Sequence, residues 1–261
     1  LSLVKFEYYM QRWTMIEPFI IAGYRYDYID TIAVILSDKE GNVGRSEACG
    51  VDYLGETIES ITAQLEGCRL SVEAGIDLTT LQNILPPGGA RNALDCALWD
   101  LNCQQRKTTI WQDTAVVQQA SIATAYTIGL IDPVRAADLA REHRDYQTIK
   151  VKADASGSLD TLASVRKARP DARIVIDANQ SWSWELFQKI HSELVALDIA
   201  LLEQPLPVAA DEPLAAYSGP IKLAADESIQ SCSELNCLVG KYDVVNIKLD
   251  KTGGLTQALK L

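Results

Sequence analysis

TIKVKA at residues 148–153 is one of six short apolar segments in the second half of the chain, five of which carry a charged residue at or near their end. The other five are TAYTIGL at 124–130, RIVIDA at 173–178, IALLEQ at 199–204, IKLAAD at 221–226 and DVVNIK at 243–248. The charged residues at or near the ends of the last five segments are Lys150, Asp177, Glu203, Asp226 and Lys248. Successive members of this series are separated by 27, 26, 23 and 22 positions. One strand plus one helix has about this length, so the pattern predicts βαβ units around a parallel sheet.

The steady period favours a closed barrel over an open sheet. A complete eight-unit (β/α) barrel at this period needs roughly 200 residues, whereas residues 122–261 number 140. We therefore expect an α/β fold, a modified TIM (β/α) barrel from which about two units are missing in this chain. The last residues, LTQALKL, have a helical pattern.

The first part of the chain has a different character. TIAVILS at residues 31–37 is β-branched and apolar, DKEGNVG supplies turn residues, and residues 45–48 return, which predicts a β-hairpin. Helical spacing begins near Glu56 and recurs in the Ala-rich run at residues 90–105. The sequence therefore predicts an N-terminal α+β capping domain at residues 1–118 and a C-terminally incomplete barrel domain at residues 119–261.

Composition limits the possible partners. The chain is 48% hydrophobic and 23% charged, with a formal net charge of -11, so it can bury a large core but repels nucleic acids and anionic membranes. It has no long apolar run or secretion signal, and its six cysteines are scattered without a paired motif. We expect a cytoplasmic protein that binds a small-molecule carboxylate, and assembly into a homo-oligomer is compatible with the sequence.

Three acidic residues are expected to form a metal site. Asp177, Glu203 and Asp226 end three consecutive strands, and barrel active sites lie at this carboxyl end. Three neighbouring carboxylates repel one another unless a hard divalent cation is shared between them. Mg²⁺, for which Mn²⁺ can substitute, is therefore the expected cofactor. The alternative is that these acids only cap the helices that follow.

Three lysines suggest proton transfer. Strand alternation directs Lys150 and Lys152 into the barrel, where mutual proximity and a metal should lower their pKa values. Lys248 ends the sixth strand, which lies opposite the second in an eight-stranded ring. One lysine could remove a proton next to a carboxylate, the metal could hold the enediolate, and the opposite lysine could return a proton. The alternative is that the lysines only extend to solvent from strand ends.

The motifs that contain these residues resemble the enolase superfamily, in its muconate-lactonizing subgroup. They occur in the order expected for that subgroup between residues 148 and 254, and they are KVK at 150–152, IDAN at 176–179, LLEQP at 201–205, AADES at 224–228 and NIKLDKTGG at 246–254. Lysine bases combined with magnesium are an established pattern of this superfamily. The last motif is most similar to that of the dipeptide epimerases, which interconvert L-Ala-D-Glu and L-Ala-L-Glu.

The resemblance implies a role for each residue. Lys152 and Lys248 would be the acid/base pair, Lys150 would assist electrostatically, and the three acids would bind magnesium. The family's Asp-x-Asp motif, which holds the dipeptide ammonium group, would lie beyond Leu261.

Substrate contacts are expected at three further positions. Residues 19–27, FIIAGYRYD, match a flexible loop that closes over the barrel mouth in the family. Within it, Arg25 could pair with a substrate carboxylate, and the alternative is an exposed loop arginine. Thr127 and Asn179 are the other two candidates.

Other functions stay open at this point. Within the subgroup they are N-acylamino acid racemase, o-succinylbenzoate synthase and muconate cycloisomerase. A Schiff-base aldolase would use a barrel lysine as nucleophile and need no cation. A non-catalytic relative would have to keep costly inward-facing charges without using them.

Overall fold

The computed structural model describes residues 3–261, which form two compact units. The first unit contains Tyr28–Ala120, Ile247–Leu261 and the beginning of the chain through Thr14. The second contains Met15–Asp27 and Ser121–Asn246. The predicted boundary between residues 118 and 119 is two residues from the change of unit after Ala120. Two segments lie in a different unit from the residues next to them in sequence. Residues 15–27 belong to the second unit, and residues 247–261 belong to the first.

The first unit contains most of an antiparallel sheet. Its strands are β1 (Val4–Ile21), β2 (Tyr24–Asp38) and β3 (Val43–Ala48), in that spatial order. The predicted hairpin is confirmed, since β2 and β3 pair antiparallel with Ile35 opposite Arg45. Its turn is closed by Asp38, whose carboxylate accepts from the backbone N–H of Asn42 at 2.9 Å.

Helices complete the first unit. They are α1 (Ile58–Glu73), α2 (Leu78–Ile84), α3 (Gly89–Arg106), α4 (Ile110–Thr114), α9 (Leu249–Thr252) and α10 (Leu255–Lys260), with a 3₁₀ turn at Asp52–Leu54. α3 corresponds to the Ala-rich run, and its residue Leu94 is buried with Leu36 and Ile61 in one apolar cluster. α10 is tied to α3, because the indole of Trp99 donates to the Thr256 hydroxyl at 2.9 Å.

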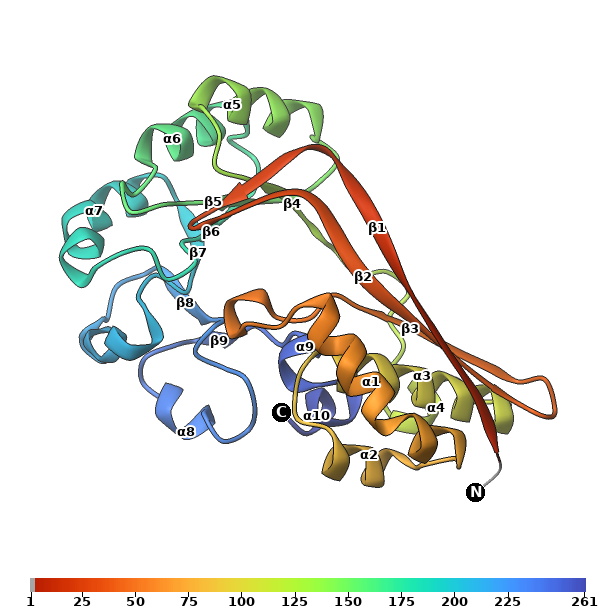
Figure 1. The fold of residues 1–261 in the computed structure, drawn as a ribbon. Coiled ribbons are helices and arrows are strands. Elements are labelled where there is room, and N and C mark those ends of the chain that lie inside the picture. Colours follow the sequence, from red (N-terminus) through yellow and green to blue (C-terminus); the bar gives the residue numbers. More distant parts are fainter. Residues whose placement is uncertain (1–2) are drawn as a thin grey trace. The chain divides into compact units, whose positions relative to one another are not determined.

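The second unit is built on a six-stranded parallel sheet in sequential order (Figure 1). Its strands are β4 (Ala125–Ile128), β5 (Thr148–Lys152), β6 (Arg173–Asp177), β7 (Ile199–Glu203), β8 (Lys222–Ala225) and β9 (Val244–Val245). Its helices are α5 (Pro133–Glu142), α6 (Leu159–Ala168), α7 (Trp184–Ala196) and α8 (Leu235–Leu238), with 3₁₀ turns at Val208–Ala210 and Glu212–Ala216. The six predicted strands and their parallel arrangement are confirmed.

Local sequence explains the βα repeat. On β5, Ile149 and Val151 are fully buried in the cluster between sheet and helices, so the alternating lysines face the other side. Asp132 caps α5 and is followed by Pro133 at the first helical position, and Ser183 caps α7. Side-chain caps thus stabilise the starts of the helices that follow β4 and β6.

Two expectations about segment ends are wrong. β9 contains only two residues, so Lys248 does not end a strand but precedes α9 as its N-cap, and its carbonyl accepts from the N–H of Thr252 at 3.1 Å. Residues 19–27 are not a loop but the tip of the β1–β2 hairpin, turning at Gly23 with φ +82°. Aromatic and β-branched residues favour pairing there.

The hairpin tip contacts the second unit's sheet, to whose compact unit it belongs. The N–H of Leu130, just after β4, donates to the carbonyl of Ile20 at 2.8 Å. The tip therefore lies against the segment that leaves the carboxyl end of β4.

No helix within residues 3–261 has both the length and the apolarity needed to cross a membrane.

Candidate active site

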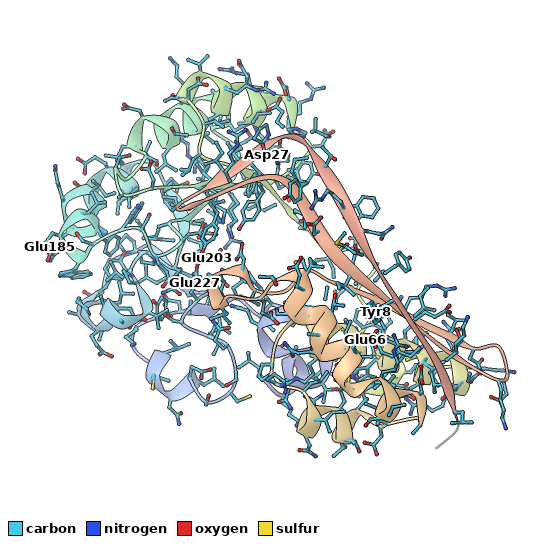
Figure 2. All side chains as sticks on the ribbon, viewed as in Figure 1. Tyr8, Asp27, Glu66, Glu185, Glu203 and Glu227 are labelled. Atoms are coloured by element: carbon cyan, nitrogen blue, oxygen red, sulfur yellow. The ribbon has the colours of Figure 1, made fainter. Side chains whose placement is uncertain are left out.

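The strand register gathers charged residues at the carboxyl end of the parallel sheet. Lys152 on β5 is opposite Asp177 on β6, which is opposite Glu203 on β7, so the three side chains form one row. Asp226 directly follows β8. Ligand oxygens of the three acids lie within 4.8 Å of one another, and all three residues are buried. Glu203 marks this end of the sheet in Figure 2.

Both lysines of β5 contact these acids. The ammonium of Lys150 lies 2.8 Å from Asp177 Oδ2 and 2.8 Å from Glu203 Oε2. The ammonium of Lys152 lies 2.8 Å from the same oxygen of Asp177, and it donates to Asn179 Oδ1 at 2.7 Å. The structure thus brings together Lys150, Lys152, Asn179 and the three acids.

Charges in this cluster shift one another's pKa values. Burial alone would raise the pKa of Asp177, but the ammonium groups of Lys150 and Lys152 outweigh it and lower that pKa. Burial and the charge of Asp177 raise the pKa of Glu203. Burial alone would lower the pKa of Lys150, yet the carboxylates of Asp177 and Glu203 raise it. Contact with two carboxylates thus stabilises the ammonium form of Lys150, and the expected lowering of the lysine pKa values beside a bound metal stays a prediction.

Sequence reasoning missed two amide side chains that hold the acids. Asn246, just after β9, donates to Glu203 Oε1 at 2.9 Å. Gln204 is fully buried, and its Oε1 accepts from the backbone N–H groups of Asp226 and Ser228 at 3.0 Å each. Both amides lie inside the motifs quoted above, but a neutral amide carries no spacing signal of its own.

Glu227 was also missed, although it follows Asp226 directly. Its side chain is buried, and its Oε1 accepts from Asn179 Nδ2 at 3.2 Å. Its Oε2 is buried and meets no hydrogen-bond donor among the described residues. Burial first, and then the charge of Asp226, raise the pKa of Glu227 to about 7. A buried, unsatisfied carboxylate is costly and is more typical of functional sites than of structural ones.

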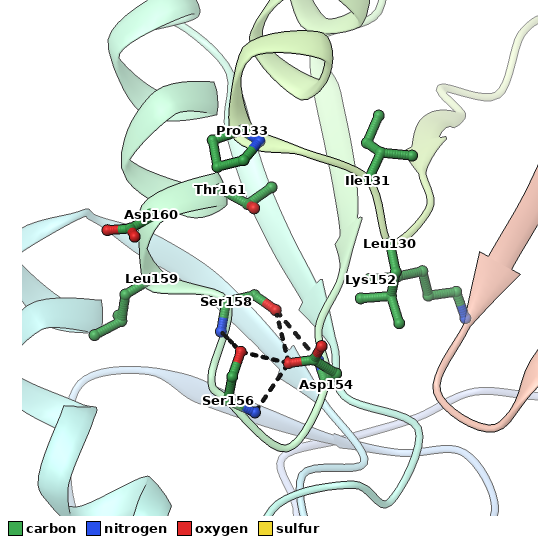
Figure 3. Close-up of a pocket in the computed structure, with 10 residues that line it drawn as sticks. All are labelled: Leu130, Ile131, Pro133, Lys152, Asp154, Ser156, Ser158, Leu159, Asp160 and Thr161. Atoms are coloured by element: carbon green, nitrogen blue, oxygen red, sulfur yellow. Dashed lines mark hydrogen bonds between the residues drawn. The ribbon is translucent and has the colours of Figure 1, made fainter.

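A pocket of about 520 Å³ opens beside Lys152 (Figure 3). Its wall includes Leu130 after β4 and the loop between β5 and α6, where Asp154 accepts from the N–H of Ser156 at 2.9 Å. Lys152 is one of the residues that line this pocket.

The remaining predicted residues have different settings. Thr127 is opposite Lys150 in the register of β4 and β5, so both occupy the same face of the sheet. Arg25 pairs with Asp27 at 2.9 Å at the hairpin tip, and both side chains are more than half exposed. Lys248 belongs to the first unit, and its position opposite Lys152 stays a prediction.

Comparison with known proteins identifies the family. Residues 6–113 match the N-terminal domain of mandelate racemase / muconate lactonizing enzyme, and residues 133–261 match the enolase C-terminal domain-like family. The chain belongs to the enolase superfamily, as the sequence motifs indicated.

Relatives within the superfamily act on amino acid derivatives. The chain is 37% identical over 254 residues to an L-Ala-D/L-Glu epimerase of Escherichia coli, covering 96% of this chain and 78% of that protein. It is also 37% identical over 232 residues to an N-acetyl-D-glutamate racemase of Pseudoalteromonas, covering 88% and 73%. A dipeptide epimerase of Methylococcus capsulatus, solved with Mg and L-Arg-D-Lys, superposes with a TM-score of 0.90 at 27% identity, covering 99% of this chain and 78% of that one.

Proposed function

We propose that the protein is a Mg²⁺-dependent dipeptide epimerase that inverts the carbon next to the carboxylate in substrates such as L-Ala-D/L-Glu. The observation that carries this proposal is the row formed by Lys152, Asp177 and Glu203. It sets a potential base directly beside a potential metal site. The names of the relatives support the substrate class.

The donor set fits magnesium. Asp177, Glu203 and Asp226 offer only hard carboxylate oxygens, which Mg²⁺ prefers. Metal–oxygen bonds of about 2.1 Å put opposite ligands about 4.2 Å apart, so oxygens within 4.8 Å need to move little. The set contains three carboxylates and two neighbouring ammonium groups, and this excess of negative charge suits a divalent cation.

Each residue has a chemical task in this proposal. When bound, Mg²⁺ would supply Lewis-acid stabilisation of the negative charge that develops at the substrate carboxylate. Lys152 removes the α-proton from one epimer or returns a proton to that face. Lys150, kept charged by Asp177 and Glu203, adds positive potential beside the developing charge. Lys248 performs the proton transfer at the opposite face.

The test is epimerization in deuterated water. We expect the full-length protein with Mg²⁺ to convert L-Ala-L-Glu and to incorporate deuterium at the α-carbon, measured by proton NMR. Lys152→Ala and Lys248→Ala should each slow epimerization at least about 100-fold, because each removes one acid/base group. Lys189→Ala, at an exposed position on α7, is the matched control and should leave the rate unchanged.

Two results would contradict this assignment. If neither active-site lysine variant alters epimerization or deuterium exchange, the two-base mechanism is wrong. If EDTA leaves the activity intact, the metal assignment is wrong.

The second candidate is racemization of an N-acylamino acid, favoured by the similarity to the N-acetyl-D-glutamate racemase. It uses the same lysines and metal, and it differs only in the group attached to the amino acid nitrogen. Parallel measurements of kcat/KM for L-Ala-L-Glu and N-acetylglutamate decide between them. A preference for the acylated amino acid would replace the dipeptide proposal.

We also propose that the protein works in the cytoplasm. All six cysteines are free thiols, which is typical of proteins in a reducing compartment. Cell fractionation with an antibody against the protein tests this location.

A further inference from the structure

Asn179 connects Lys152 to Glu227. Lys152 Nζ donates to Asn179 Oδ1 at 2.7 Å, and Asn179 Nδ2 donates to Glu227 Oε1 at 3.2 Å. Lys152 and Glu227 are both less than a tenth exposed. The three side chains therefore form a hydrogen-bonded chain that starts at the proposed base and ends at an acid to which no role is assigned above.

The donors and acceptors of these three side chains allow only one orientation of the Asn179 amide. An ammonium group only donates hydrogen bonds, so Asn179 must turn its oxygen toward Lys152. Its NH₂ group then needs an acceptor, and Glu227 provides one. Without that acceptor the partly buried NH₂ would lose its partner, and a rotated amide would present donors to the ammonium group.

The backbone at Asn179 limits other arrangements. Its N–H donates to Asp177 Oδ1 at 3.0 Å, and its φ of +42° is in the left-handed region, which asparagine tolerates better than most residues. The main chain is thus held in place. Rotation of the side chain is the freedom that remains, and the bond to Glu227 restricts it.

Lys152 needs this support. Its other contact is Asp177 Oδ2, which also receives Lys150. An oxygen shared between two ammonium groups, and proposed to bind a metal, holds each lysine less firmly. Asn179 Oδ1 is the one contact among these that Lys152 does not share.

We propose that Glu227 is a positioning residue, which orients the amide of Asn179 and through it holds Lys152 at the reacting carbon. This inference rests on the proposed epimerase function. It assigns Asn179, expected from the sequence to bind substrate, to the support of the base.

The experiment compares proton exchange from the two epimers. Solvent deuterium uptake is measured separately for L-Ala-L-Glu and L-Ala-D-Glu with Mg²⁺, and Lys152→Ala identifies the epimer that Lys152 serves. Glu227→Leu should slow exchange of that epimer about tenfold, the scale of one lost hydrogen bond, and change the other less than about twofold. Glu227→Gln keeps an acceptor for Asn179, so both rates should stay within about twofold of wild type.

The comparison of epimers separates positioning from weakened metal binding. Poorer metal binding or general instability would slow both epimers alike, and such an equal loss, or no loss, would overturn the inference. Glu185→Leu, an exposed glutamate at the start of α7, is the matched control and should change neither rate. If Glu227→Leu does not fold, Asn179→Gly removes the same link at a residue whose positive φ glycine accepts, and the same asymmetry is expected.

A crystal structure of Glu227→Leu, or of Asn179→Gly, supplies a readout that needs no substrate. We expect Lys152 Nζ to leave the position it holds in the wild type. An unmoved Lys152 would overturn the inference even if the substrate proved not to be a dipeptide. Lack of activity of the wild type on every dipeptide would instead refute the proposed function.

Discussion

Two buried lysine clusters lie in the second unit, and they differ in how completely their charges are matched. In the Lys241 cluster, Lys241 pairs with Asp211 Oδ1 at 2.7 Å, and Asp211 Oδ2 accepts from Ser228 Oγ at 2.8 Å and from Tyr242 OH at 3.0 Å. Both oxygens of Asp211 are satisfied. In the Lys152 cluster, which comprises Lys150, Lys152, Asp177, Glu203, Asp226 and Glu227, acids outnumber lysines and one buried oxygen has no donor among the described residues.

This difference indicates which of the two clusters stabilises the fold. A buried ion pair whose partners satisfy each other needs nothing more from outside the chain. A cluster with excess negative charge is costly unless something positive binds to it. We therefore expect substitutions in the Lys241 cluster to reduce stability, and substitutions in the Lys152 cluster to reduce activity.

The largest expected effect comes from matched Asp→Asn substitutions. Asp177→Asn should lower kcat/KM for L-Ala-L-Glu about 1,000-fold, because it removes a proposed metal ligand at the site of charge development. Asp211→Asn should instead lower the free energy of unfolding by about 3–5 kcal/mol, because buried Lys241 then keeps only the solvent-exposed Glu212 as an acidic partner. Steady-state kinetics and urea unfolding of both variants measure these effects.

Each variant is the control for the other. Asp177→Asn should cost less stability than Asp211→Asn, since Lys150 keeps Glu203 and Lys152 keeps Asn179 as partners. Equal losses of stability with equal losses of activity would remove the distinction between the two clusters.

The second prediction concerns the pH dependence of stability. Burial raises the pKa of Glu227 from 4.5 to about 7, so its ionised form is disfavoured in the folded protein. Stability should therefore fall as the pH rises from about 4.5 to about 7 and should not change further through this group. Glu227→Gln cannot ionise, so its stability relative to wild type should rise by about 3 kcal/mol over this range.

Urea unfolding at about pH 4 and about pH 8, in EDTA, measures this difference. Glu212→Gln, which removes an exposed acid beside Lys241, is the control and should show no comparable trend. Parallel pH profiles for wild type and Glu227→Gln would contradict a strongly raised pKa.

The smallest expected effect is stabilisation by the metal. Mg²⁺ at about 100 times its Kd should raise the free energy of unfolding by about 2.7 kcal/mol, because it binds the folded state alone. Thermal unfolding with Mg²⁺ and with EDTA measures the shift. Asp226→Asn should reduce it and Asp211→Asn should not, so a shift of the same size in both variants would place the ion elsewhere.

Much of the fold could be predicted because its signals are local. Alternation on β5 separates Ile149 and Val151 from the lysines, and this follows from strand geometry alone. The acids at the ends of β6 and β7 repeat with the βα period, so their convergence follows once the strands are known to be parallel.

The extents of two strands could not be predicted, because they depend on how far each strand pairs with its neighbour. β9 pairs with β8 over two residues only, so Lys248 lies beyond the strand even though its segment is β-like in sequence. Residues 19–27 are expected from the sequence to form a loop, but they are strand on both sides of Gly23 because β1 and β2 pair across the hairpin. Local patterns cannot show how far such pairing extends.

The sequence by itself determined the six parallel strands, the inward direction of Lys150 and Lys152 and the meeting of three acids, because each follows from periodicity along the chain. Only the tertiary structure decided that Asn179 joins Lys152 to Glu227, and that Lys150 is held in its charged form. Hydrogen bonds and charge interactions between distant residues depend on a few ångströms of side-chain placement, and that placement is set by packing.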